Sequence, residues 1–163
     1  MNKQDIFCYL DNRNIHYEVT EHKPVYNMAE LNEVILPHPD ALAKNIFVCD
    51  DKKREYYLIT VKGNKRVNLK DFRKEYGTRR LTFADENDMR ELLGLSPGSV
   101  TPLGLLNDKE CKVHFFLDKD FLSIPLIIGI HPNDNTATIW LSTNDLMSIL
   151  KKHGNEVQLI EVK

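Results

Sequence analysis

Cysteine is scarce in this sequence, and the few cysteines present form no pattern. Cys8, Cys49 and Cys111 lie far apart among 163 residues, and no Cys-x-x-Cys pair occurs. An odd number of widely separated cysteines argues against a disulfide framework and against a zinc site built from thiolates. We expect all three to be small buried hydrophobic residues in a reducing compartment.

Long apolar runs are also missing. The longest lies near Ile124–Ile130 and is well short of the ~20 residues that a membrane span requires. The opening residues, Met1–Asp5, lack the apolar core of a signal peptide. We therefore expect a soluble, cytoplasmic protein with no membrane partner.

The common catalytic signatures are absent too. The sequence contains no Gly-x-Ser-x-Gly, no Walker loop, no Gly-x-Gly-x-x-Gly and no His-Glu-x-x-His. Serine hydrolase, P-loop nucleotide, dinucleotide-binding and zinc protease chemistry therefore lack support. The six histidines are scattered and suggest no pair of metal ligands. We expect neither a metal nor another cofactor.

The composition that remains is that of an ordinary globular protein. With 42% hydrophobic and 28% charged residues, the chain can bury one sizeable core without disulfides or a structural metal. The length favours a single domain, which we place over residues 1–163.

The net charge of −2 hides an asymmetry along the chain. Residues 52–80 contain eleven Lys or Arg against three acidic residues, so this segment carries +8 and the remainder −10. A basic segment in a nearly neutral protein can bind a polyanion such as a nucleic acid. It can equally be the solvated face of a hairpin and a helix.

The hydrophobic pattern predicts about eight strands and four or five helices in mixed order. Hairpins dominate the middle of the chain, which argues against a doubly wound parallel sheet. The predicted fold class is α+β: one domain with a largely antiparallel, barrel-like mixed sheet and surrounding helices. The predicted helices span residues 5–12, 27–35, 68–77, 85–94 and 142–154. The predicted strands span residues 16–21, 45–49, 56–62, 100–106, 112–117, 126–130, 136–141 and 157–162.

Two short motifs combine a proline with a residue of chemical interest. In the loop from Gly98 to Pro102, glycine permits a positive φ and proline fixes φ, so main-chain groups are held rigidly. Such groups can orient a water or a ligand hydroxyl, although a plain turn is the simpler interpretation. The proline after His131 ends a predicted strand there and leaves the imidazole at a sheet rim, either as a functional group or as a surface residue.

Two further features could border a cleft. Lys44 and Asn45 open an apolar strand, where a lysine is either a solvated end or a binder of phosphate. Residues 17–26 predict a strand ending in a bend stiffened by Pro24. This bend is either a connector or a pocket wall shaped by Val25, Tyr26 and Met28.

Taken together, these motifs resemble the prolyl-tRNA editing family, the YbaK/ProX type of free-standing aminoacyl-tRNA deacylase related to the insertion domain of bacterial prolyl-tRNA synthetases. The resemblance covers almost the whole chain, and its last motif and its Lys-Asn pair are closer to the ProX branch. The motifs are His22-Lys23-Pro24-Val25, Ala43-Lys44-Asn45, Gly98-x-x-x-Pro102, and His131-Pro132 followed by Asn135-Thr136-Ala137-Thr138.

The resemblance implies a YbaK-like fold and hydrolysis of a wrongly charged amino acid from tRNA(Pro), alanine in the ProX branch and cysteine in the YbaK branch. It implies catalysis by positioning, without a metal, because an aminoacyl ester is already activated. Lys44 would anchor the terminal nucleotide or the aminoacyl group, Gly98 would hold the reacting oxygen or water, and His131 would contact the amino acid or ribose. The substrate-binding residues would be Asn45, Ser99, Thr101, Pro102 and Asn135.

Editing is needed because a proline site excludes a smaller amino acid by only about 1–3 kcal/mol per missing methylene. Val25, Ile35 and Leu36 are the predicted size sieve. The partner implied is tRNA(Pro) carrying a non-cognate amino acid, with prolyl-tRNA synthetase a further candidate and the oligomeric state open. Two alternatives remain: a non-catalytic sensor of an amino acid or charged tRNA, and nonspecific nucleic-acid binding through the basic segment.

Overall fold

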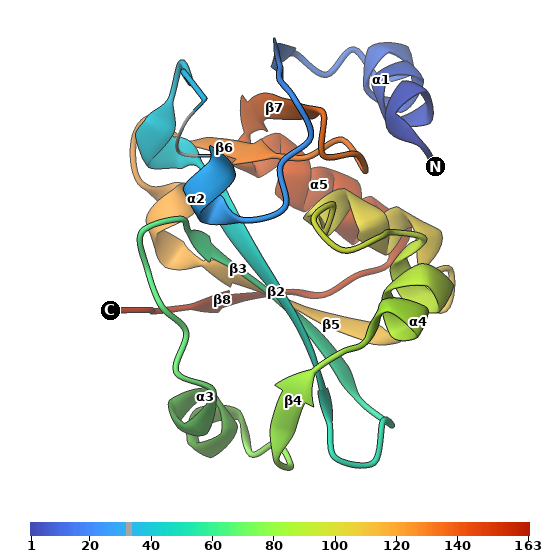
Figure 1. Ribbon diagram of the computed structural model, residues 1–163, viewed down its shortest axis with the longest axis vertical. Coiled ribbons are helices and arrows are strands. Elements are labelled where there is room, and N and C mark those ends of the chain that lie inside the picture. Colours follow the sequence, from blue (N-terminus) through green and yellow to red (C-terminus); the bar gives the residue numbers. More distant parts are fainter. Residues whose placement is uncertain (32–33) are drawn as a thin grey trace.

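Two β-sheets and the helices around them form the protein, described here by a computed structural model that covers residues 1–31 and 34–163 (Figure 1). The smaller sheet has the strand order β1-β7-β6, and the larger has the order β4-β2-β3-β5-β8. The strands are β1 (Tyr17–Glu21), β2 (Ala43–Asp50), β3 (Tyr56–Lys62), β4 (Leu81–Phe83), β5 (Val113–Asp118), β6 (Ile127–Ile130), β7 (Ala137–Ser142) and β8 (Val157–Ile160). The helices are α1 (Lys3–Asn12), α2 (Met28–Leu31), α3 (Leu69–Tyr76), α4 (Glu86–Asp88) and α5 (Thr143–His153).

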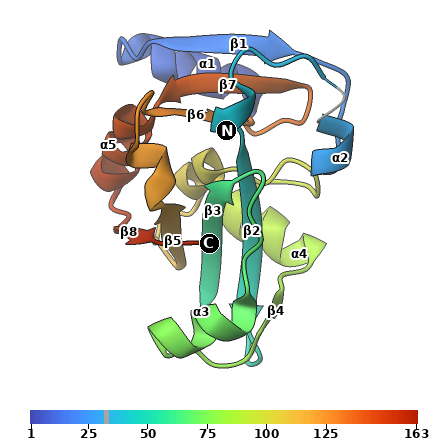
Figure 2. The same cartoon turned by 90° about the vertical axis from the view of Figure 1, so that its left-hand side faces the viewer.

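Most strand pairs are antiparallel, as the sequence predicts. The pairs β1·β7, β6·β7, β2·β3 and β2·β4 are antiparallel, whereas β3·β5 and β5·β8 are parallel. The predicted α+β class is therefore confirmed. The strands form two distinct sheets, and Figure 2 shows the smaller sheet crossing one end of the long β2–β3 hairpin.

Both faces of β3 are covered, which explains its sequence. Leu58 packs in the main core, whereas Tyr57, Ile59 and Val61 pack on the opposite face with Phe72 of α3. A strand buried on two sides reads as a continuous apolar run instead of an alternation. This covering fixes β2, the partner of β3, and so fixes the residues at the start of β2.

The helix boundaries follow the caps that the sequence predicts. The side chains of Asn68, Asp85 and Ser142 accept hydrogen bonds from the first turns of α3, α4 and α5. Asn27 does the same for Glu30 in α2. Such caps satisfy amide groups that have no partner inside the helix.

Several local predictions are wrong. The segment 100–106, predicted as a strand, leads into the 3₁₀ helix η3 (Pro102–Asn107), because a buried apolar run does not by itself distinguish strand from helix and Pro102 lacks the N–H of a ladder donor. Strand β4 was not predicted, since three residues are too short for a pattern. The helix predicted over 27–35 covers only Met28–Leu31 among the described residues, residues 32–33 lie outside them, and Ile35 is not helical. Of the three cysteines expected to be buried, Cys49 is buried, Cys111 is half-buried and Cys8 is exposed.

A main-chain bridge at Gly129 of β6 joins the smaller sheet to the chain entering the larger one. The bridge partner is Leu42, just before β2. A Cβ on Gly129 would lie 2.2 Å from the ring of Trp140, a residue that is 2% exposed. Only glycine leaves room for this ring between the strands, and the junction brings the start of β2 beside the end of β6.

Candidate functional site

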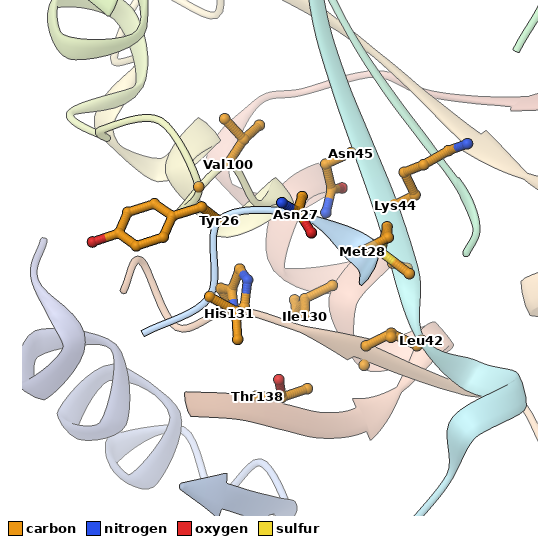
Figure 3. A pocket seen from close by; sticks show the side chains of 14 residues that line it. Tyr26, Asn27, Met28, Leu42, Lys44, Asn45, Val100, Ile130, His131 and Thr138 are labelled. Carbon is orange, nitrogen blue, oxygen red and sulfur yellow. The ribbon is translucent and has the colours of Figure 1, made fainter. Parts of the chain in front are cut away.

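A pocket of about 210 Å³ opens at the junction of the two sheets. Five parts of the chain that are distant in sequence form it: the bend before α2, the start of β2, the loop before η3, the end of β6 and the start of β7. Figure 3 shows their side chains converging. The lining residues are Val25, Tyr26, Asn27, Met28, Leu42, Ala43, Lys44, Asn45, Gly98, Val100, Gly129, Ile130, His131 and Thr138.

His131 follows β6 and is held by a main-chain carbonyl. Its Nδ1 lies 2.8 Å from the carbonyl oxygen of Ala137. Because a carbonyl only accepts, Nδ1 carries the proton, and Nε2 of the neutral ring is an acceptor. Burial lowers the pKa of His131, against the opposing effect of the bond to Ala137, and nearby His22 lowers it further. The ring is thus neutral near pH 7, with an acceptor nitrogen.

Lys44 and Asn45 reach the pocket from β2 but use their polar atoms differently. The ammonium of Lys44 donates to the main-chain carbonyl of Lys65, and Figure 3 shows this side chain extending away from His131. Burial, with a smaller effect of Arg66, lowers the pKa of Lys44. Asn45 accepts a 2.6 Å hydrogen bond from Thr60 at Oδ1. Its Nδ2 has no partner among the described residues and is directed toward the pocket (Figure 3).

Gly98 brings the main chain of its loop against the bend before α2. Its φ is +86°, and a Cβ there would lie 3.0 Å from Tyr26 Cδ1 and 3.3 Å from the Val25 carbonyl oxygen. Both the backbone conformation and the close approach require glycine. The wall formed by Gly98 and Tyr26 is therefore made by main chain as much as by side chains.

The predicted site residues divide into two groups. Lys44, Asn45, Gly98, His131 and Val25 line the one pocket. The other predicted residues lie outside its lining. Ser99, Thr101 and Pro102 are buried within the loop that begins at Gly98. Ile35 is 95% exposed, and Leu36 packs against the cluster around Trp140. Asn135 donates through Nδ2 to the Val25 carbonyl at 2.9 Å.

Thr138 lines the pocket and is hydrogen-bonded to His22 behind it, and no role was predicted for either residue. Thr138 is fully buried, and its Oγ1 lies 3.0 Å from Nε2 of His22. The Nδ1 of His22 lies 2.9 Å from the Lys23 carbonyl. Both residues occur in the motifs that carry the family resemblance, but only the pairing of β1 with β7 and the bend after β1 bring them together.

Three apolar residues of the pocket wall were not among the predicted site residues. Leu42, Val100 and Ile130 line the pocket with Val25 and Met28. Nothing in their local sequence marks them as pocket residues, because apolar residues at strand ends are usual in any core. The size of the pocket is set by these side chains.

The basic segment is not one continuous patch. Lys53, Lys65 and Arg79 form ion pairs at 2.6 to 2.9 Å with Asp85, with Asp118 and Asp120, and with Asp51. Figure 2 places α3 at the end of the β2–β3 hairpin away from the smaller sheet. Lys62 and Lys65 instead line a second hollow, of about 380 Å³, which shares Met28 and Leu42 with the pocket.

The part of the chain that the structure describes contains neither a membrane-spanning helix nor a cluster of metal ligands. No helix there is long and apolar enough to cross a membrane. Within the same residues, no group of three or more His, Cys, Asp or Glu side chains is placed to hold a metal ion.

A protein-family model matches the part of the chain that contains the pocket. The model of the aminoacyl-tRNA editing domain matches residues 22–149, which include every residue of the pocket lining. The chain belongs to the aminoacyl-tRNA editing domain family. This match confirms the predicted family. Its members of the YbaK/ProX type are editing hydrolases.

Similar proteins agree with this membership over nearly the whole chain. The prolyl-tRNA editing protein ProX of Acetoanaerobium sticklandii is 36% identical over 98% of this chain and 97% of its own length. The mouse prolyl-tRNA synthetase associated domain-containing protein 1 is 37% identical over 87% of this chain and 85% of its own length. A solved structure of a candidate trans-editing enzyme for prolyl tRNA synthetase has the same fold, with a TM-score of 0.70, 22% identity, and coverage of 99% of this chain and 96% of that one.

Proposed function

We propose that this editing domain is a trans-editing deacylase that hydrolyses alanyl-tRNA(Pro). The observation that carries the proposal is the convergence of Lys44, Asn45, Gly98 and His131 on one small pocket. These are the residues to which the family resemblance assigns the reaction. The similarity to ProX over almost the full length of both chains supports prolyl-tRNA as the substrate class.

The reaction is the addition of water to the ester carbonyl carbon, followed by cleavage of the bond to the ribose oxygen. The products are the free amino acid and the uncharged tRNA, whose ribose oxygen takes a proton. An activated ester needs little more than correct placement of water, carbonyl and ribose hydroxyls. Nδ2 of Asn45 is available as a donor to a substrate oxygen, and Nε2 of His131 as an acceptor for a substrate N–H or O–H.

His131 acts as a positioning group in this proposal. A catalytic histidine base is ordinarily oriented by a third group that stabilises its charged form. Here that place is taken by the uncharged carbonyl of Ala137, and burial lowers the pKa of the ring. A neutral imidazole with a fixed acceptor nitrogen is well suited to hold the ribose or the amino acid.

The pocket walls support a small amino acid. Val25, Leu42, Val100 and Ile130 surround a space of about 210 Å³. This volume alone also holds residues larger than alanine, so we propose that the shape of the apolar lining, and not its volume, selects a small amino acid, as the second sieve of an editing system requires. Cysteine differs from alanine by one sulfur atom, so cysteinyl-tRNA(Pro) is the alternative substrate. A sensor that binds the charged end without hydrolysis is the alternative function.

The hollow beside the pocket carries charges of both signs. Lys62 and Lys65 line it together with Asp40 and Asp120, Lys65 is paired with Asp118 and Asp120, and Lys44 donates to the main-chain carbonyl of Lys65. Lysine binds phosphate as a point charge. We propose that the terminal nucleotides of the tRNA lie along this hollow and that Lys44 holds the segment 62–65 in place or turns toward a phosphate.

The test is deacylation of alanyl-, cysteinyl- and prolyl-tRNA(Pro) by the wild type and by Lys44→Ala, each against a control without protein. Rapid loss of alanine alone, abolished in a folded Lys44→Ala, is the expected result. Hydrolysis of the cysteinyl ester alone would show that cysteinyl-tRNA(Pro), and not alanyl-tRNA(Pro), is the substrate. If the protein accelerates the hydrolysis of no ester, the deacylase proposal is overturned and the sensor function is favoured. Arg73→Ala on α3, away from the pocket (Figure 2), is the matched loss of one positive charge.

A further inference from the structure

A chain of two hydrogen bonds fixes the direction of the Thr138 hydroxyl. The Lys23 carbonyl lies 2.9 Å from Nδ1 of His22, and Nε2 of the same ring lies 3.0 Å from Thr138 Oγ1. A carbonyl only accepts, so Nδ1 carries the ring proton and Nε2 of the neutral ring accepts. The Thr138 hydroxyl therefore donates its proton to His22, and its oxygen is left with acceptor capacity only.

Thr138 belongs to the pocket lining, and its exposed fraction is 0%. Figure 3 shows its hydroxyl directed toward the space below His131 and Ile130. His22 lies behind it, with its ring centroid 6.1 Å from that of His131, and is not itself a lining residue.

The pocket consequently has an accepting wall and a donating wall. Thr138 Oγ1 and His131 Nε2 accept on the side of β6 and β7, while Asn45 Nδ2 can donate from β2. No Asp or Glu is among the lining residues. An aminoacyl ester carries a complementary pair of groups, a carbonyl oxygen that accepts and an α-amino group that donates.

We propose that Thr138, with its proton held by His22, binds the α-amino group of the aminoacyl ester. The ester carbonyl then faces Asn45, and the side chain faces the apolar wall. His22 is a positioning residue, because it touches Thr138 and not the substrate. This inference deepens the deacylase function and rests on it for the identity of the ester.

The test combines a change in the protein with a change in the substrate. Propionyl-tRNA(Pro) equals the alanyl ester without its α-amino group. We expect Thr138→Val to lower kcat/KM about tenfold on the alanyl ester, the effect of one lost hydrogen bond, and to leave the propionyl ester unchanged. Equal losses on both esters, or no loss on either, would overturn the proposal, because a merely structural effect does not depend on the amino group.

Conservative variants separate the hydroxyl from packing. Thr138→Ser is expected to restore activity on the alanyl ester. His22→Gln, which keeps an acceptor, is expected to resemble the wild type, whereas His22→Phe loses activity and adds nothing to Thr138→Val in the double variant. Thr143→Val is the matched control: Thr143 is equally buried but lies outside the pocket lining. Thermal unfolding of each variant checks the fold.

A binding measurement distinguishes this inference from the deacylase function. The amide of alanine with 3′-amino-adenosine cannot be hydrolysed as an ester, and its propionyl counterpart lacks the amino group. Calorimetry should show tighter binding of the alanyl amide by the wild type and equal binding of both by Thr138→Val. If the wild type prefers the alanyl amide but hydrolyses no ester, the proposed role of Thr138 in binding stands and the deacylase function is overturned. A wild type that binds both amides equally would overturn the binding role.

Discussion

The hydroxyl of Thr101 donates a 2.8 Å hydrogen bond to the main-chain carbonyl of His131. Thr101 is fully buried and belongs to the loop that begins at Gly98, whereas His131 directly follows β6. The bond joins two pocket walls that are 30 residues apart in sequence. A residue expected to bind substrate is therefore placed behind the site, where it fixes the position of His131.

Replacing Thr101 by valine tests this link. The variant keeps the shape and loses one buried hydrogen bond, so we expect a loss of about 1 kcal/mol in the free energy of unfolding and a lower kcat/KM on the edited ester. Thr143→Val is the matched change, since the buried Thr143 hydroxyl has no partner among the described residues. Removing an unsatisfied hydroxyl should raise the melting temperature. Equal shifts in the two variants would contradict the role of the Thr101 bond.

Gly98→Ala tests the close contact with the bend. The new Cβ meets Tyr26 and the Val25 carbonyl at a φ of +86°, so we expect at least a tenfold fall in kcat/KM and a loss of about 1 kcal/mol in stability. Gly77→Ala is the control, because φ is +64° there and nothing lies within 4 Å. It should lose similar stability and keep full activity. If Gly98→Ala is as active as Gly77→Ala, the loop that begins at Gly98 takes no part in the reaction.

The lowered pKa of His131 predicts a dependence of stability on pH. Burial moves this pKa below 6.5. Between 6.5 and the folded pKa, the unfolded chain binds a proton that the folded chain does not, so stability falls as pH drops through this window. Above 6.5 the effect is absent. Urea unfolding at a series of pH values should show a smaller fall below pH 6.5 for His131→Asn than for the wild type, and identical slopes would refute the shift. The ester hydrolysis should persist somewhat below pH 6.5, because the ring is still neutral there.

Gly129→Ala tests the junction of the two sheets. The added Cβ lies 2.2 Å from the Trp140 ring, so the ring must move, at a cost of about 1–3 kcal/mol. Trp140 is the only tryptophan in the chain, and its fluorescence should therefore report the displacement directly. Gly63→Ala is the comparison, because its closest contact is the flexible end of Met28 at 2.7 Å. A larger loss of stability at Gly63 would show that the junction is less tightly packed than described.

The sequence by itself determined most of the elements and several of the residues that meet in the pocket. The apolar patterns of β2 and β3 and the caps at Asn68 and Ser142 act through neighbours in the chain, so they can be recognised without the fold. Lys44, Gly98 and His131 stand beside prolines, glycines or strand ends, which marks them locally. That these residues line one pocket was left open by the motifs and comes from the tertiary structure.

The tertiary structure alone decided which groups line the pocket and which of them donate or accept hydrogen bonds there. Ile35, apolar in sequence, is exposed, while Ile130 and Leu42 form the wall. The acceptor role of Thr138 depends on the ring of His22, 116 residues away in sequence. Hydrogen-bond direction and burial arise from atoms brought together by sheet pairing, and no local pattern encodes them.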